Sequence, residues 1–215
     1  MRLELPLPGS WYALPLGDPD ARTRIRRFAQ DVHGAGDARA LDRIRLRRRL
    51  HLALAHAERG RAEQLHLGRA LEGGVPLPAS IAVYPGIAVS TAVDATPGAV
   101  MDALVPLVLR AAHEPRGGSA VPGPDDRVLR APRSLVLRRP TLERVETGEL
   151  GALPTLRIDY WITMPDARHA RLVHVVAPAT PHAGLLQSLF DEIVVGARWR
   201  AASALATELR GAPPA

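Results

Sequence analysis

Histidine is the residue type in this chain best suited to metal binding, and two histidine pairs are close enough in sequence to compare with known ligand spacings. His51 and His56 are five residues apart, which places them about 140° apart on a helix. His169 and His174 are also five apart, so on one strand they would face opposite sides. Neither pair has the i, i+4 spacing of a helical zinc-binding pair, and the chain has no cysteine. We therefore expect no metal site and no cofactor.

Residues suited to acid–base or nucleophilic catalysis are present but not arranged for it. No Gly-x-Ser-x-Gly motif occurs, and Ser80 opens an expected strand, where a turn explains its hydroxyl better. Asp125 and Asp126 lie in a Pro- and Gly-rich loop and are expected to be solvated turn residues. Asp191 and Glu192 are neighbours on an expected helix, so their carboxylates point apart. Without lysine there is no Walker motif, and no Gly-x-Gly-x-x-Gly follows a strand. We expect no catalytic residues and no enzymatic activity.

The stretch Arg43–Arg61, "RIRLRRRLHLALAHAERGR", has five arginines in its first seven residues. Its apolar residues recur at spacings of three and four, which predicts an amphipathic helix. The predicted core face is made of Leu46, Leu50, Ala53, Leu54 and Ala57. The opposite side carries Arg45, Arg48, Arg49 and Arg59, with Leu41, Ile44 and Leu52 nearby.

Three interpretations of that outer side stay open. The simplest is a solvated face on which arginine stems cover apolar surface. A second is a surface for a partner protein, since three apolar side chains would otherwise be exposed; its candidate residues are Arg45, Arg48, Arg49 and Leu52. A third is nucleic-acid binding through region 21–61. The third is disfavoured because no aromatic residue, on which bases could stack, lies between Arg39 and Arg61.

The positive charge is concentrated in one region of the chain. The chain of 215 residues has a net charge of +6, and all 28 basic residues are arginine. Ten arginines and three aspartates fall between Ala21 and Leu50, an excess of +7, so the remainder is close to neutral. No apolar run of 18 or more residues exists, and the opening "MRLELPLPGSW" lacks the apolar core of a signal peptide. We expect a cytoplasmic protein without a membrane span.

Four helices are predicted from apolar spacing and from start and stop residues. The first begins with Asp18 as N-cap and Pro19 in the first turn and ends near His33. The second is capped by Asp37 and ends at Gly60. The third starts at about Pro97 and is kinked or divided by Pro106. The fourth runs from about residue 183 to residue 209, followed by a disordered tail at 211–215.

Strands are predicted where apolar and polar residues alternate. The clearest is "LRIDYWITM" (156–164), with a hairpin partner at 171–177 and further strands at 134–139 and 142–146. Alternation at 65–71 and 81–83 gives two more, with "YPG" (84–86) as a turn. Trp161 lies on the less apolar face of its strand, and we expect a helix to cover it. The predicted class is α+β: a mostly antiparallel sheet flanked by helices, as an α/β/α sandwich.

The order of these segments resembles the PsbP-like fold, which also occurs in the Ran-binding nuclear import factor and in bacterial effector chaperones. The resemblance rests on "LPLPGSWYALPL", "GGVPLPASI", the hairpin "LRIDYWITMPDARHARLVHVVAPAT" and the closing "LLQSLFDEIVVGARW". The chain is also similar to uncharacterised actinobacterial proteins with the same "VPLPAS" and "LFDEI…RW" signatures. The resemblance to the PsbP-like fold implies one domain over residues 1–210, with an N-terminal two-helix addition at about 18–60.

The resemblance implies a protein-binding scaffold, because several members of this fold act as adaptors or chaperones. It transfers no catalytic residue. The expected function is therefore a non-enzymatic adaptor or chaperone, with a bacterial secretion or assembly system as a candidate setting. Nucleic-acid binding through region 21–61 is the alternative.

Overall fold

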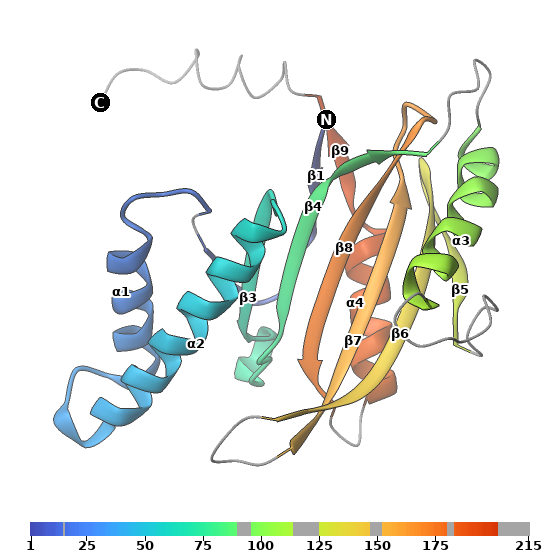
Figure 1. Cartoon of the computed structure of the whole chain (residues 1–215). Helices are drawn as coiled ribbons and strands as arrows, with labels where there is room; N and C mark the ends of the chain where they lie inside the picture. The colour runs from blue at the N-terminus through green and yellow to red at the C-terminus, as the bar shows by residue number, and fades with distance from the viewer. Residues whose placement is uncertain (15, 90–95, 114–124, 147–151, 180–182, 202–215) are drawn as a thin grey trace.

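The computed structural model describes residues 1–14, 16–89, 96–113, 125–146, 152–179 and 183–201. Its centre is a seven-stranded sheet in which every neighbouring pair is antiparallel (Figure 1). In order across the sheet the strands are β2 (Ser10–Ala13), β3 (Gln64–Ala70), β4 (Ser80–Ala88), β8 (His169–Pro178), β7 (Ala152–Thr163), β6 (Ser134–Glu146) and β5 (Arg127–Ala131). A separate two-stranded sheet joins β1 (Arg2–Glu4) and β9 (Arg198–Arg200).

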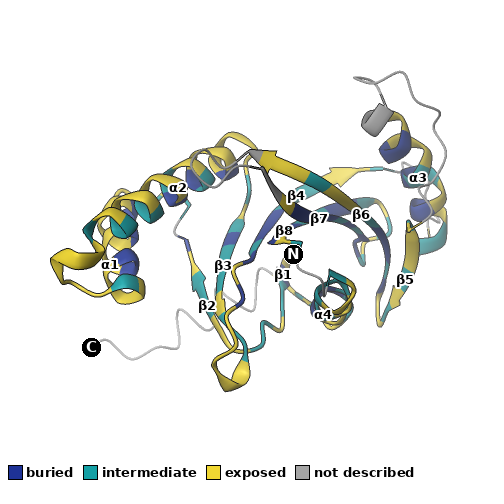
Figure 2. Ribbon diagram, turned by 90° about the horizontal axis from the view of Figure 1, so that it is seen from below, coloured by how far each residue is buried: buried dark blue, intermediate teal, exposed yellow. Residues whose placement is uncertain are grey.

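Helices cover both faces of the large sheet (Figures 1 and 2). One face packs against α4 (Ala183–Val195), and the other carries α1 (Ala21–His33) and α2 (Ala40–Arg59) near one edge and α3 (Pro97–His113) near the other. Short 3-10 turns lie at Asp37–Arg39 and Glu72–Gly74. The predicted α+β sandwich is confirmed. No helix in the described part of the chain has both the length and the apolar character to cross a membrane.

The largest core lies between the sheet and α4. Alternation along β7 buries Leu156, Ile158, Tyr160 and Ile162 on this face, because successive strand side chains point to opposite sides. The helix contributes its apolar stripe at spacings of three and four, Phe190, Ile193 and Val194. Figure 2 shows the buried residues concentrated where the layers meet.

The other face of the sheet has two smaller cores. Near one edge, Met101 and Leu104 of α3 pack with Leu137, and half-buried Trp161 lies against this cluster. The expectation that a helix covers Trp161 is confirmed. Near the other edge, α1 and α2 pack together and onto β3 and β4 through Ile25, Phe28, Leu50, Leu54, Ala57, Leu65 and Ala82. The predicted core face of the second helix is confirmed for Leu50, Leu54 and Ala57, and Leu46 packs against this core while only partly buried. Ala53, also predicted on that face, is half-buried outside this core.

The helix starts differ from those expected. The first helix begins at Ala21, not next to Asp18, because the Asp18 carboxylate accepts the Asp20 N–H (2.8 Å) in a turn before the helix. A 3-10 turn begins at Asp37, and regular α-helix starts only at Ala40. Pro106 lies inside α3 without dividing it.

The end of the fourth helix was predicted too far along the chain. The helix stops at Val195, and Arg198–Arg200 form β9, where Trp199 pairs with Leu3 of β1. The Trp199 ring donates its Nε1–H to Ser134 Oγ (3.0 Å) and lies under the Arg171 guanidinium. Residues 202–209 of the predicted helix and the predicted tail at 211–215 lie outside the described residues.

Two expected breaks in strands are absent. β4 continues through Tyr84, Pro85 and Gly86, where a turn was predicted, and the register shifts between Val83 and Gly86. A β-bulge takes up the irregular backbone there without ending the strand. β6 is one strand across Pro140, because β5 pairs only as far as Arg138 and leaves β6 a single neighbour at the proline.

Candidate functional site

Helices α1 and α2 form a hairpin whose outer surface carries a groove between the two helices. The turn is tied by Arg43, whose Nη1 donates to the carbonyls of Gly34 (2.8 Å) and Gly36 (2.6 Å). We call the groove on the side away from the sheet the outer groove; its volume is about 610 Å³. It is lined by Arg22, Thr23, Arg26, Ile44, Arg47, Arg48, His51 and Leu52.

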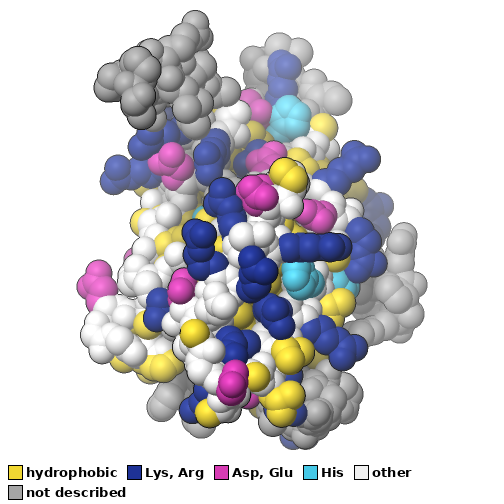
Figure 3. Space-filling view, turned by 90° about the vertical axis from the view of Figure 1, so that its left-hand side faces the viewer, with side chains coloured by type: hydrophobic (Ala, Val, Ile, Leu, Met, Phe, Trp, Pro, Cys, Tyr) yellow, Lys and Arg dark blue, Asp and Glu magenta, His cyan; other side chains and the backbone are white. Residues whose placement is uncertain are grey.

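The arginines of the outer groove have no polar partner among the described residues. None of Arg22, Arg26, Arg47 and Arg48 makes a hydrogen bond or ion pair with any residue that the structure describes. By contrast, Arg24 pairs with Asp18 (3.2 Å) on the same hairpin. Figure 3 shows arginines gathered over this side of the molecule, with apolar patches between them. Arg22 and Arg26 are four residues apart on α1, where like charges repel, so this pair does not stabilise the hairpin.

An exposed apolar stripe runs along α2 beside these arginines. Leu41, Ile44 and Leu52 are 67%, 50% and 55% exposed. Spacings of three and eight residues place them on one side of the helix, opposite buried Leu50 and Leu54. The outer side of the hairpin therefore combines unpaired positive charge with apolar surface that nothing in the described chain covers.

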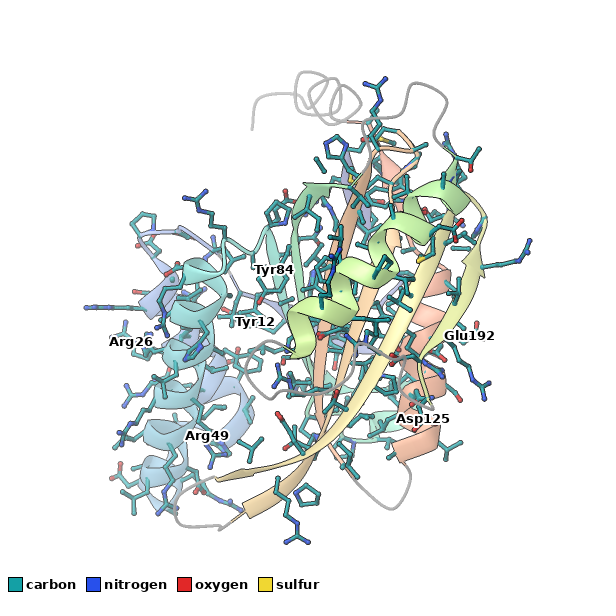
Figure 4. All side chains as sticks on the ribbon, turned by 45° about the vertical axis from the view of Figure 1, so that its right-hand side comes forward. Tyr12, Arg26, Arg49, Tyr84, Asp125 and Glu192 are labelled. Atoms are coloured by element: carbon teal, nitrogen blue, oxygen red, sulfur yellow. The ribbon has the colours of Figure 1, made fainter. Side chains whose placement is uncertain are left out.

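The four predicted partner-binding residues separate into different places. Arg48 and Leu52 line the outer groove. Arg49 lines a second groove between α2 and the sheet, and its position can be compared with that of Arg26 in Figure 4. Arg45 is exposed and interacts within the molecule. Arg22, Arg26, Arg47 and His51 were not predicted, although the excess of arginine over both helices was the available signal.

The second groove, which we call the inner groove, lies between the hairpin and the open part of the sheet. Its volume is about 770 Å³. Helices α1 and α2 supply Phe28, Val32, Leu46, Arg49, Leu50 and Ala53. The sheet and its loops supply Leu67, Gly68, Arg69, Pro76, Pro78, Ala79, Ser80, Glu143, Val145, Thr155, Arg157, His174, Val176, Ala177 and Pro178. No sequence signal predicted this groove, because its residues come from distant segments.

Charged residues of the inner groove are partly paired. Arg157 Nη1 donates to both carboxylate oxygens of Glu143 at 3.2 Å, and His174 Nδ1 lies 2.6 Å from Asp159 Oδ1. Arg49 and Arg69 make no hydrogen bond or ion pair with the described residues. The single glutamate of the lining is thus engaged, while two arginines are not.

Two tyrosines lie between the hairpin and the sheet (Figure 4). The Tyr12 ring stacks on Phe28, with centroids 4.4 Å apart. Burial raises the pKa of Tyr84, and the Asp159 carboxylate raises it further. Burial also raises the pKa of Tyr12. Both hydroxyls therefore stay protonated near neutral pH.

The candidate acidic pairs have structural partners. The Asp126 side chain is only 7% exposed and bonds Arg139 (3.1 Å), so the prediction that it is a solvated turn residue is wrong; Asp125 is exposed. Asp191 turns inward, accepting from Arg138 (2.5 Å) and from the Tyr160 hydroxyl (2.8 Å), while Glu192 is exposed.

The histidine pairs do not assemble a metal centre within the described residues. His51 lines the outer groove and His56 is exposed elsewhere on α2. His169 bonds Asp166 (2.8 Å), and His174 bonds a different carboxylate, Asp159. No group of three or more His, Asp or Glu side chains suited to a metal is found in that part of the chain.

Comparison with other proteins adds no identification. No protein-family model matches this chain, no curated protein matches it, and no solved structure matches it. The resemblance to the PsbP-like fold stays a prediction.

Proposed function

We propose that this chain is a non-enzymatic protein-binding adaptor or chaperone whose outer groove binds an acidic amphipathic helix of a partner protein. The observation that carries the proposal is the set of four arginines around the groove with no ion pair among the described residues. A cytoplasmic location belongs to the same proposal, with a bacterial secretion or assembly system as a candidate setting.

The chemistry of the outer groove selects this type of partner. A helix laid between α1 and α2 could bury its apolar ridge on Ile44 and Leu52, which are half exposed. Glutamates or aspartates flanking that ridge would meet Arg22 and Arg26 on one side and Arg47 and Arg48 on the other. Such helix-in-groove recognition uses anchors at i, i+3, i+4 and i+7. Complementary charge would speed association and fix the orientation of the partner.

Nucleic-acid binding through region 21–61 is the second candidate, and the density of positive charge favours it. The lining of the outer groove argues against it. Ile44 and Leu52 lie among the arginines, and the lining contains no Phe, Tyr or Trp for base stacking. A phosphate backbone prefers a continuous basic track, which these apolar side chains interrupt.

The test places a photo-crosslinking amino acid at Thr23, which lines the outer groove, in cells of the source organism. A second protein carries it at exposed Thr141 on β6 as a control. We expect a specific protein adduct from position 23 alone, crosslinked through an acidic amphipathic helix. An adduct with nucleic acid, or the same adducts from both positions, would contradict the proposal.

The crosslinked segment is then measured as a peptide by fluorescence polarisation. Charge reversal at Arg26 and Arg48 should weaken binding about tenfold or more, since each exposed ion pair contributes ~0.2–1 kcal/mol and reversal adds repulsion. Arg59→Glu is the matched control, because Arg59 is exposed on α2 outside the outer groove. Equal binding by the double variant and the control would show that the outer groove is not the contact.

A further inference from the structure

The inner groove has a composition that the proposed function does not use. It lies on the opposite side of α2 from the outer groove, between the helical hairpin and the sheet. Its walls are mostly apolar, formed by residues such as Phe28, Leu46 and Ala53 on the helices and Val176 on the sheet. Val145, at its rim, is 39% exposed. A volume of about 770 Å³ falls within the range of small-molecule sites.

The groove exists because three helices do not cover the whole second face of the sheet. The hairpin packs on β3 and β4 through Leu65 and Ala82, while α3 packs near Leu137 and Ala170. Between them, the end of the sheet that carries Thr155 and neighbouring strand residues has no helix over it among the described residues. The opening is thus built into the spacing of the helices and does not depend on one side-chain rotamer.

Positive charge in this apolar setting points to the ligand class. The lining holds three arginines and one glutamate. Glu143 is engaged with Arg157 through both carboxylate oxygens, whereas Arg49 and Arg69 have no partner among the described residues. A guanidinium beside apolar walls pairs well with a carboxylate, because its donors match the two oxygens.

We propose that the inner groove binds a small amphiphile with a carboxylate head, of the fatty-acid type. The acyl chain lies along the apolar walls, and the carboxylate is held by Arg49 and Arg69. The ligand's charge offsets the excess of arginine, and its chain removes Leu46 and Val176 from water. This inference does not rest on the proposed function, because the two sites are on different sides of α2.

The first measurement is calorimetric titration of the full chain with decanoate and with decanol. These probes share a chain length and differ in the charged head. We expect saturable binding of decanoate and at least tenfold weaker binding of decanol, since a hydrogen bond to a charged group is worth roughly that much. No binding of decanoate, or equal binding of the two probes, would overturn the proposal; the second result would indicate an apolar site that does not read charge.

Adjacent arginines on α2 supply a matched pair of variants. Arg49→Leu should weaken decanoate binding about tenfold and leave decanol unchanged. Arg48→Leu, which changes the outer groove, should leave both affinities unchanged. If the two variants bind decanoate equally, Arg49 does not hold the head. The two variants also separate the two proposals, because only Arg48→Leu should weaken binding of the partner peptide to the outer groove.

A steric variant tests where the chain lies. Ala53 lines the inner groove and is half-buried, so Ala53→Phe should fill part of it and abolish binding of both probes. Circular dichroism and thermal unfolding show whether this variant folds. Should it fail to fold, Val145→Trp at the exposed rim replaces it. Undiminished decanoate binding by a folded variant would place the ligand elsewhere and overturn the assignment.

Discussion

Arginine has opposite roles in two regions of this molecule. In the sandwich, Arg138 and Arg171 are 5% and 4% exposed, and each is bonded to a carboxylate, Asp191 and Glu63 respectively. In the helical hairpin, Arg22, Arg26 and Arg48 of the outer groove are exposed, and neither they nor half-buried Arg47 are paired among the described residues. The same residue type is therefore buried and paired in one region, and has no polar partner among the described residues in the other.

Burial explains the difference. A buried guanidinium requires a carboxylate, because desolvation of an unpaired charge costs several kcal/mol. An exposed arginine has no such requirement, since water solvates its charge. Pairing is therefore enforced by the fold in the sandwich and optional in the hairpin. The unpaired arginines of the outer groove have exposed apolar neighbours, Ile44 and Leu52, which the buried arginines of the sandwich lack.

The largest expected effect comes from breaking a pair in the sandwich. Asp191→Ala leaves buried Arg138 without a carboxylate, although its Nη2 still donates to the Asp125 carbonyl, and leaves the fully buried Tyr160 hydroxyl without its acceptor. It should lower the free energy of unfolding by about 3–5 kcal/mol. Chemical denaturation measures it. The matched control is exposed Glu192→Ala, one residue along α4, expected within ~0.5 kcal/mol of wild type. Similar losses in both would mean that the buried pair is no different from surface charge.

A smaller effect of opposite sign is expected in the hairpin. Arg22 lies in the first turn of α1, which has no acidic residue there. Arg22→Glu should stabilise the protein by about 0.3–1 kcal/mol through the helix dipole and relief of repulsion from Arg26. The same variant should bind the acidic partner helix more weakly. Loss of stability in denaturant would indicate that Arg22 has a structural role after all.

The smallest effect concerns a half-buried histidine whose partner is a neutral amide. His66 on β3 bonds the neutral amide of Gln64 (3.1 Å), and burial, with Arg2 nearby, lowers its pKa below the ordinary 6.5. Protonation then favours the unfolded state, so this contribution to stability is complete above about pH 6.5 and declines as the pH falls below it.

The measurement compares unfolding free energies at pH 7 and pH 5. His66→Gln should reduce the loss between these two values, because the variant has no proton to bind preferentially when unfolded. Exposed His56→Gln is the control for removing a histidine. If the wild type and both variants lose equal stability on acidification, His66 is not the group responsible.

Much of the fold was predictable because local patterns and tertiary packing agree. Alternation along Leu156–Ile162 predicted a strand with one buried face, and it is buried against α4. Spacings of three and four predicted that Leu50, Leu54 and Ala57 face the core. Where pattern and packing disagree, the prediction failed: residues 198–200 continue an apparent helix but pair with β1, near the other end of the chain.

The candidate sites were less predictable than the fold. Arg48 and Leu52 were found from helical spacing, since both lie on the α2 wall of the outer groove. Arg49 was assigned to the same surface as Arg48. Consecutive residues on a helix are about 100° apart, so the Arg49 side chain lines the inner groove instead. The Arg138–Asp191 pair joins residues 53 apart in sequence, a separation that carries no local signal.

The sequence by itself determined which segments are amphipathic and which face of each is apolar, because that periodicity is a local property of side-chain spacing. Only the tertiary structure decided which arginines are paired and which line a groove, since that depends on what other segments bring near each guanidinium. Glu63 reaches Arg171 from across the sheet, while no described segment brings a carboxylate to Arg26 or Arg49. The sequence gives the number and positions of the charged residues, but tertiary packing sets the surroundings of each charge.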